Sequence, residues 1–237
     1  MTPHPLLSSE TLHLWTVQVS ELRDSPSEWE SLLSTEERER SARFHRKEDG
    51  ERFVLAHGLL RLLIGRYLSQ TPESLRFVIN PFGKPQLFPL PEPPLRFNIS
   101  HSGDYVLLAF VETGQVGVDV EVHRNELVQT ELGRDIFSDS EYEFLISQPL
   151  KKQKEVFFDL WTGKEAVLKA RGMGLSLDLK SFDIKLSDNK VSLTETRDDL
   201  TEAKRWQMRI ISLNEGYSAA AAFDAKIETV EVYKFWG

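Results

Sequence analysis

The stretch Val116–Val122, VGVDVEV, is the most informative in this chain, because it places a valine at every second position. Alternate side chains of a β-strand share one face, so the valines predict a buried face. Asp119 and Glu121 then project together from the other face. Two carboxylates in this arrangement suit a hard divalent cation such as Mg²⁺. Taken alone, the pattern favours a half-buried strand with a solvated acidic face.

Strand-like runs also lie on both sides of this stretch. Directly before it, Leu95–His101 and Tyr105–Glu112 are joined by Ser-Gly-Asp, which is typical of a hairpin turn. The later strand-like runs are Phe182–Leu186, Val191–Leu193, Trp206–Leu213 and Tyr217–Phe223. The chain therefore contains several short strands in each of its halves.

Two helical regions with similar starts accompany these strands. Ser34 and Glu37 match a capping box, in which the serine accepts from the amide three residues on and the glutamate reaches back. Ser138 and Glu141 repeat the pattern. The expected helices are Ser34 to about Lys47, Asp49–Leu68 and Gln153–Arg171.

These elements predict an α+β fold that contains a duplicated unit. Each half holds helices and a short sheet. We expect an N-terminal half over residues 1–114 and a C-terminal half with a C-terminal tail over residues 115–237. No flexible linker separates them, so the halves are expected to pack tightly.

Composition narrows the class of protein. The chain has 237 residues and a formal net charge of −8, and 40% of its residues are hydrophobic, which is enough for a core. The acidic excess argues against a nucleic-acid binder. The sequence contains no run of about 20 apolar residues, so it predicts no membrane span. The chain has no cysteine, which excludes disulfides, thiolate zinc sites and cysteine nucleophiles. We therefore expect a cytoplasmic protein with neither a nucleic-acid nor a membrane partner.

The third helix carries a second candidate for chemistry. Trp161, Glu165 and Lys169 recur every four residues and lie along one stripe of the helix. A carboxylate at the border of an apolar stripe is partly desolvated, which favours metal ligation or work as a base. A plain surface pair between Glu165 and Lys169 is an equally good interpretation of this segment alone.

Three further segments could contact a phosphate. Ser100 and His101 end a strand before a turn, and Lys84 lies in a Gly-Lys-Pro turn. In isolation each favours simple turn chemistry. The basic cluster comprises Arg38, Arg40, Arg43, Arg46, Lys47 and Arg52. Arginine suits phosphate because its planar fork binds two oxygens, although interleaved glutamates also fit a solvated helix face.

The order and spacing of these segments together resemble the 4′-phosphopantetheinyl transferases of the monomeric, Sfp-like class. The resemblance runs from Ser34 to Leu175, and its most specific blocks are Asp-x-Glu at Asp119 and Trp-x-x-Lys-Glu-x-x-x-Lys from Trp161 to Lys169. It implies a pseudo-dimer of two similar α+β halves with coenzyme A bound between them. Such an enzyme transfers the 4′-phosphopantetheine arm of coenzyme A to a serine of an acyl or peptidyl carrier protein and releases adenosine 3′,5′-bisphosphate. The carriers of this class serve fatty acid, polyketide and nonribosomal peptide biosynthesis.

The resemblance also implies roles for matching residues. Mg²⁺, or Mn²⁺ as a substitute, would bind Asp119, Glu121 and Glu165. Glu165 would also be the base for the carrier serine, with Lys169 as the second catalytic residue. The coenzyme A contacts implied are Lys84, Ser100, His101, Arg52, Arg46, Lys164 and Phe82. The expected state is a monomer, because a duplicated chain completes its own site.

Two other functions remain open from the sequence. One is a different Mg²⁺-dependent phosphoryl-transfer enzyme that uses the same carboxylates and binds no coenzyme A. The other is a non-catalytic module that binds carrier proteins. The intact set of Asp119, Glu121, Glu165 and Lys169 argues against the second.

Overall fold

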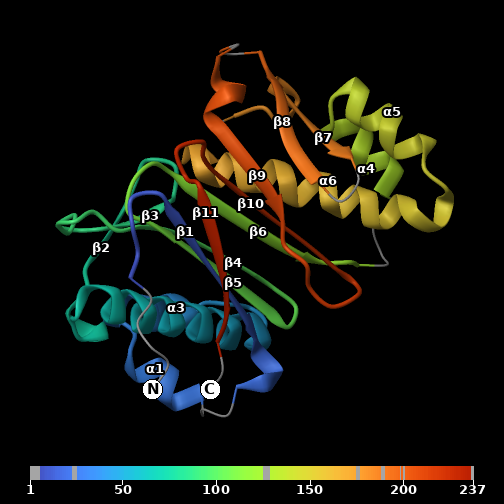
Figure 1. Cartoon of the computed structure of the whole chain (residues 1–237). Coiled ribbons are helices and arrows are strands. Elements are labelled where there is room, and N and C mark those ends of the chain that lie inside the picture. The colour runs from blue at the N-terminus through green and yellow to red at the C-terminus, as the bar shows by residue number, and fades with distance from the viewer. Residues whose placement is uncertain are drawn as a thin grey trace.

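Two β-sheets face each other at the centre of the molecule, and one long helix covers the outer face of each (Figure 1). The computed structural model describes residues 6–22, 26–124, 129–174, 177–187, 190–197, 199 and 201–235. The four layers from one side to the other are helix, sheet, sheet and helix.

The first half contains a four-stranded sheet in the order β11-β1-β5-β4 and a short β2–β3 hairpin. Its helices are α1 (Pro26–Ser31), α2 (Thr35–Ser41) and α3 (Lys47–Leu68). Its strands are β1 (Thr11–Gln18), β2 (Phe77–Ile79), β3 (Pro85–Leu87), β4 (Arg96–Ser102) and β5 (Tyr105–Val111).

The second half contains a three-stranded sheet in the order β6-β10-β9 and a β7–β8 hairpin. Its helices are α4 (Gln129–Ile136), α5 (Asp139–Ser147) and α6 (Leu150–Arg171). The strands of this part and the last strand are β6 (Val116–Val122), β7 (Phe182–Ser187), β8 (Lys190–Thr196), β9 (Trp206–Ile210), β10 (Tyr217–Asp224) and β11 (Thr229–Lys234). No helix of the described part of the chain is both long enough and apolar enough to span a membrane.

The order of elements repeats between the halves. The series β1, α2, α3, β2–β3, β4, β5 recurs as β6, α5, α6, β7–β8, β9, β10, and the sheet order β1-β5-β4 recurs as β6-β10-β9. The expectation of an α+β pseudo-dimer is confirmed. The last strand, β11, departs from the repeat, because it pairs in parallel with β1 of the first half. The division into domains at residues 114 and 115 falls in the β5–β6 turn and stays a prediction.

Both predicted capping boxes are present, and the glutamate of each one also forms an ion pair with a buried basic side chain. Glu37 accepts from Arg61 at 2.6 Å, and Glu141 pairs with Lys164 at 2.8 Å. Arg61 and Lys164 each occupy the fifteenth position of a 22-residue helix. The two halves therefore anchor their long helices in the same way.

Hydrophobic side chains form three clusters that follow the layers. One lies between α3 and the first sheet, one between α6 and the second sheet, and one between the two sheets. The valines Val116, Val118 and Val120 belong to the third cluster, as their alternation predicted.

Two helix ends differ from the sequence prediction. The helix expected from Ser34 to about Lys47 ends at Ser41, and α3 begins separately at Lys47. The long helix α6 begins at Leu150 and not at Gln153, because Pro149 already serves as its N-cap residue. The predicted end at Gly172 is confirmed, since this glycine has φ of 68° and closes the helix in the left-handed region.

Candidate active site

The candidate site lies where the edge of the first sheet meets the edge of the second. Side chains of β4 accept hydrogen bonds from backbone amides of β6, so the two sheets are joined without a regular strand ladder. The three contacts are Val118 N to Asn98 Oδ1 at 2.8 Å, Val120 N to Ser100 Oγ at 3.3 Å, and Val122 N to Ser102 Oγ at 3.2 Å. This seam fixes the position of β6 against the first half.

The two acids of β6 lie on the side of the strand away from the buried valines. Asp119 Oδ1 accepts from Ser100 Oγ at 2.9 Å and from Lys169 Nζ at 2.6 Å. Glu121 Oε2 accepts from Ser102 Oγ at 2.8 Å. The side chains predicted from alternation and from helical spacing therefore meet in one place.

Helix α6 brings Glu165 to the same group. Burial raises the pKa of Glu165, and the negative charges of Asp119 and Glu121 raise it further, while Lys169 opposes them. Burial likewise raises the pKa of Glu121, with a further contribution from Asp119. Three carboxyl groups thus share a poorly solvated space with one ammonium group, Lys169.

Two carboxylate oxygens in this space have no hydrogen-bond partner. Asp119 Oδ2 and Glu165 Oε1 are buried and unpaired, and a buried unpaired acceptor is unfavourable. A divalent cation would bind both oxygens, so the donor set fits a hard metal ion. Within the described ranges, no three acidic or histidine side chains are already arranged as a metal site.

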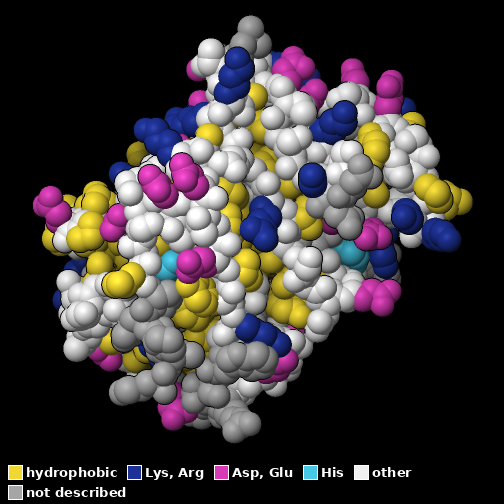
Figure 2. Space-filling model, viewed as in Figure 1, with side chains coloured by type: hydrophobic (Ala, Val, Ile, Leu, Met, Phe, Trp, Pro, Cys, Tyr) yellow, Lys and Arg dark blue, Asp and Glu magenta, His cyan; other side chains and the backbone are white. Residues whose placement is uncertain are grey.

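A basic cleft opens between α2, α3 and the β2–β3 hairpin. It has a volume of about 790 Å³. Its charged lining combines Arg38, Arg40, His57, Arg61 and Arg76 with Glu36, Glu37 and Glu73, beside apolar side chains. On the face shown in Figure 2, hydrophobic side chains gather over β2 and β3. A cleft with cationic and apolar walls suits a ligand that carries both phosphates and an aromatic base.

His101 lies among positively charged neighbours. Burial lowers its pKa to about 4, and the charges of His57, Arg52 and Lys169 lower it further in the same direction. The imidazole is therefore neutral at neutral pH. An anion bound here would offset the neighbouring cations.

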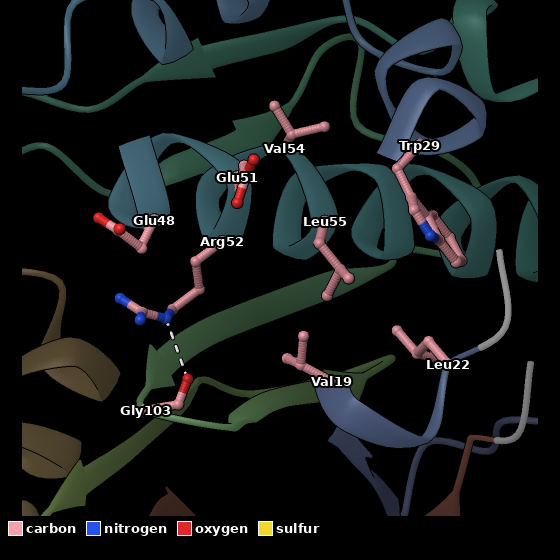
Figure 3. A pocket seen from close by; sticks show the side chains of 9 residues that line it. All are labelled: Val19, Leu22, Trp29, Glu48, Glu51, Arg52, Val54, Leu55 and Gly103. Carbon is pink, nitrogen blue, oxygen red and sulfur yellow. Dashed lines mark hydrogen bonds between the residues drawn. The ribbon is translucent and has the colours of Figure 1, made fainter. Parts of the chain in front are cut away.

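Arg52 lies at one end of an apolar pocket of about 280 Å³ (Figure 3). Its Nε donates to Gly103 O at 3.0 Å, and its Nη1 donates to Asp49 at 3.0 Å. The bond to Gly103 ties α3 to the β4–β5 turn. Arg46 is exposed at the N-cap of α3 and does not line the basic cleft.

Lys84 bridges the two halves. Its Nζ donates to Val116 O at 3.0 Å and to Lys169 O at 2.7 Å, and burial lowers its pKa to about 8. Phe82 lies in the same turn and is 47% exposed. Ser100 is buried and directs its hydroxyl to Asp119.

Lys164 does not join the site, and the structure corrects its predicted role. The side chain is 0% exposed, and its Nζ contacts Leu179 O, Phe182 O and Glu141 Oε1 at 2.6–2.8 Å. All three N–H donors are therefore used inside the core. The predicted contact with a phosphate is incompatible with this position, because no donor remains for it.

The structure adds residues that sequence reasoning missed. His57 and Arg76 line the cleft, but they lie outside any local pattern. Asn98 did carry a signal, because polar side chains stand at every second position of β4. That alternation marks a polar edge facing β6. The hydroxyl of Ser102, in the same segment, was expected from the sequence as a possible phosphate contact.

Comparison with known proteins gives matches over both halves. Residues 115–222 match the family described as the 4′-phosphopantetheinyl transferase superfamily, and residues 20–113 match the family described as 4′-phosphopantetheinyl transferase, N-terminal.

Individual relatives cover most of the chain. The 4′-phosphopantetheinyl transferase Sfp of Bacillus subtilis is 37% identical over 69% of this chain and 71% of its own. The 4′-phosphopantetheinyl transferase HetI of Nostoc sp. is 33% identical over 93% of this chain and 90% of its own. Among solved structures, the holo-[acyl-carrier-protein] synthase of Thermotoga maritima is 20% identical, with a TM-score of 0.39 over 46% of this chain and 62% of its own.

Proposed function

This chain belongs to the 4′-phosphopantetheinyl transferase superfamily, and on that premise we propose how its residues carry out the reaction. The protein is a transferase that attaches the 4′-phosphopantetheine arm to a carrier protein. One observation carries the proposal for the site. Two buried carboxylate oxygens without partners, Asp119 Oδ2 and Glu165 Oε1, lie beside Lys169 at the seam between the halves.

We propose coenzyme A as the donor of the arm. Its adenosine and 3′-phosphate would occupy the basic cleft, where Arg38, Arg40 and Arg76 supply cationic donors. His57, which lines this cleft, and Arg52 are close enough to His101 for their charges to lower its pKa. Phe82 is exposed on the hairpin turn, where an adenine ring could pack against it.

Mg²⁺, with Mn²⁺ as a substitute, is the cofactor that the donor set suits best. Asp119, Glu121 and Glu165 would hold it, and when bound it would neutralise charge on the pyrophosphate. Lys169 contributes a second positive charge at the same place. Charge neutralisation and in-line positioning are the main requirements of phosphoryl transfer.

Glu165 is proposed as the base for the carrier serine. Its carboxylate oxygen Oε1 is buried without a hydrogen-bond partner, so it is available to accept a proton. The serine hydroxyl transfers its proton to Glu165 while its oxygen forms a bond to the phosphorus that bears the pantetheine arm. The phosphoanhydride bond breaks, and adenosine 3′,5′-bisphosphate leaves with the electron pair.

Acyl and peptidyl carrier proteins are the proposed acceptors, and a cytoplasmic monomer is the proposed form. The monomer is supported by the duplicated order of elements, since both walls of the seam come from one chain.

The test is intact-protein mass spectrometry of an apo carrier protein incubated with this protein, coenzyme A and Mg²⁺. We expect a mass gain of one phosphopantetheine, which EDTA abolishes. No gain on either carrier class, together with no coenzyme A binding, would favour a different Mg²⁺-dependent phosphoryl transfer. Coenzyme A binding without any gain on several carriers would favour the non-catalytic carrier-binding module.

A further inference from the structure

The seam between β4 and β6 contains three similar contacts, but only two of them reach the acidic group. Asn98, Ser100 and Ser102 each accept a hydrogen bond from an amide of β6. The two serines also donate to a carboxylate, whereas the Asn98 side chain, within the described residues, bonds to Val118 N alone. The seam thus combines a structural contact with two contacts that orient carboxylates.

We propose that Ser102 is a positioning residue that holds the Glu121 carboxylate in place for the divalent cation. The hydroxyl accepts from Val122 N at 3.2 Å and donates to Glu121 Oε2 at 2.8 Å. Its orientation is therefore determined by the backbone of the same strand that carries Glu121. This inference rests on the function proposed above.

The position of Ser102 is itself fixed from several sides. Arg52 of α3 donates to Gly103 O at 3.0 Å (Figure 3). Asp104 N donates to the hydroxyl of Tyr217 on β10 at 2.9 Å. The Asp104 carboxylate accepts from the amide of Ser20 at 2.8 Å and from Gln18 Nε2 at 2.9 Å. The turn after Ser102 is thus held by both halves of the molecule.

Such support matters because Glu121 is only partly enclosed and has a flexible side chain. Asp119 is held by Ser100 and by Lys169, whereas Ser102 is the single hydrogen-bond donor that the structure gives to the Glu121 carboxylate within its described part. A carboxylate that must bind a metal is usually oriented by such a hydrogen bond, and its loss typically weakens metal affinity by about 10–100-fold.

The test uses the full chain with coenzyme A present and no carrier protein, and measures Mn²⁺ binding by electron paramagnetic resonance. We expect Ser102→Ala to bind Mn²⁺ about 10-fold or more weakly than the wild type. Ser102→Thr keeps the hydroxyl and should restore most of the affinity. Asn98→Ala is the matched control, because it removes a seam contact of the same kind without removing a donor to a carboxylate.

Thermal unfolding separates positioning from stability. Asn98→Ala and Ser102→Ala should both lower Tm, but only Ser102→Ala should weaken Mn²⁺ binding. If Ser102→Ala does not fold, Ser102→Cys repeats the test with a side chain of similar shape that donates weakly.

Wild-type Mn²⁺ affinity in a folded Ser102→Ala variant overturns the inference and leaves the proposed function intact. An equal loss of affinity in Asn98→Ala also overturns it, because the effect would then belong to the seam as a whole. A wild-type chain that binds no Mn²⁺ would overturn the proposed metal site and this inference together.

Discussion

Glu165 shows how strongly one side chain depends on its surroundings. The sequence places it on a helical stripe, but the raised pKa comes from burial and from Asp119 and Glu121, which lie more than forty residues away in the chain. Lys169 is the opposing charge. The chemistry of this residue is thus a property of the assembled site.

Glu165→Gln is expected to abolish most turnover. The amide nearly preserves the shape of the side chain but can neither accept the serine proton nor supply negative charge to a cation. General bases typically contribute about 10²–10⁴-fold to a rate. Carrier modification should fall by at least that factor in a mass-spectrometric time course, while thermal unfolding stays close to the wild type. A folded variant with unchanged turnover would remove Glu165 from the mechanism.

Glu37 offers a prediction about acid stability. Burial alone would raise its pKa, but hydrogen bonds from His57, the Ser34 amide and Arg61 outweigh burial and lower the pKa to about 2. The folded pKa lies below the unfolded value of 4.5, so the stabilisation is present above pH 4.5 and is lost as the pH falls toward 2. A shift of this size corresponds to about 3 kcal/mol.

Glu37→Gln should therefore remove this part of the pH dependence. Urea unfolding between pH 2 and 5 should show a shallower fall in the free energy of unfolding than in the wild type. At pH 7 the variant should lose about 3 kcal/mol, because Arg61 is left in the core without its partner. Glu39→Gln, at an exposed position of α2, is the control and should keep the wild-type slope. Parallel curves for Glu37→Gln and wild type would contradict the assignment.

At the scale of elements, the contact between α6 and β6 decides where the site forms. Gly117 follows the first valine of β6, and a Cβ atom there would lie 2.1 Å from Ala166 O and 2.3 Å from Ala170 N. The helix backbone can approach the strand only because this side chain is absent. The approach brings Lys169 within 2.6 Å of Asp119.

Gly117→Ala is expected to destabilise the fold by about 3 kcal/mol or more, because backbone atoms of α6 must move to accommodate the methyl group. Chemical unfolding measures this loss. Gly163→Ala in α6 is the control. A Cβ atom added at Gly163 would lie 2.6 Å from the flexible end of the Ile184 side chain, which can move aside. Similar losses in both variants would show that the close approach at Gly117 has no special importance.

At the scale of the whole molecule, the side chain of Lys84 connects the halves by binding backbone carbonyl groups of the second half. Its ammonium group donates to Val116 O at the start of β6 and to Lys169 O near the end of α6. The turn that carries it also donates from Asn80 Nδ2 to Gly172 O at 3.0 Å. The β2–β3 hairpin of the first half thus supports both elements that carry the carboxylates.

Lys84→Met should cost about 2 kcal/mol at pH 7, because it removes the ammonium donor from two part-buried carbonyl groups. Burial lowers the folded pKa of Lys84 to about 8, below its unfolded value of 10.5. Between these values the unfolded chain binds a proton that the folded chain does not, so the wild type gains stability as the pH rises.

The stability gap between wild type and Lys84→Met should therefore widen from pH 8 to pH 10.5. Urea unfolding across this range, with the exposed Lys185→Met as the control, measures it. A difference in the free energy of unfolding that stays constant across this range would show that Lys84 keeps its ordinary pKa in the folded state.

Local patterns identified most of the elements but not all of their contacts. The valine alternation in Val116–Val122 and the capping boxes at Ser34 and Ser138 are written within a few residues, so they predicted β6, α2 and α5. The pairing of β11 with β1 joins residues more than two hundred positions apart, and no local pattern encodes it.

The sequence by itself determined the family and the two similar halves, and it singled out Asp119, Glu121, Glu165 and Lys169 as candidates for the site. These depend on residue type, spacing and periodicity, which are local properties. The tertiary structure alone decided that Lys164 lies in the core, that Ser100 directs its hydroxyl to Asp119, and that Ser102 orients Glu121. Those contacts depend on how β4, β6 and α6 pack together, and this packing sets which donors remain available for a ligand.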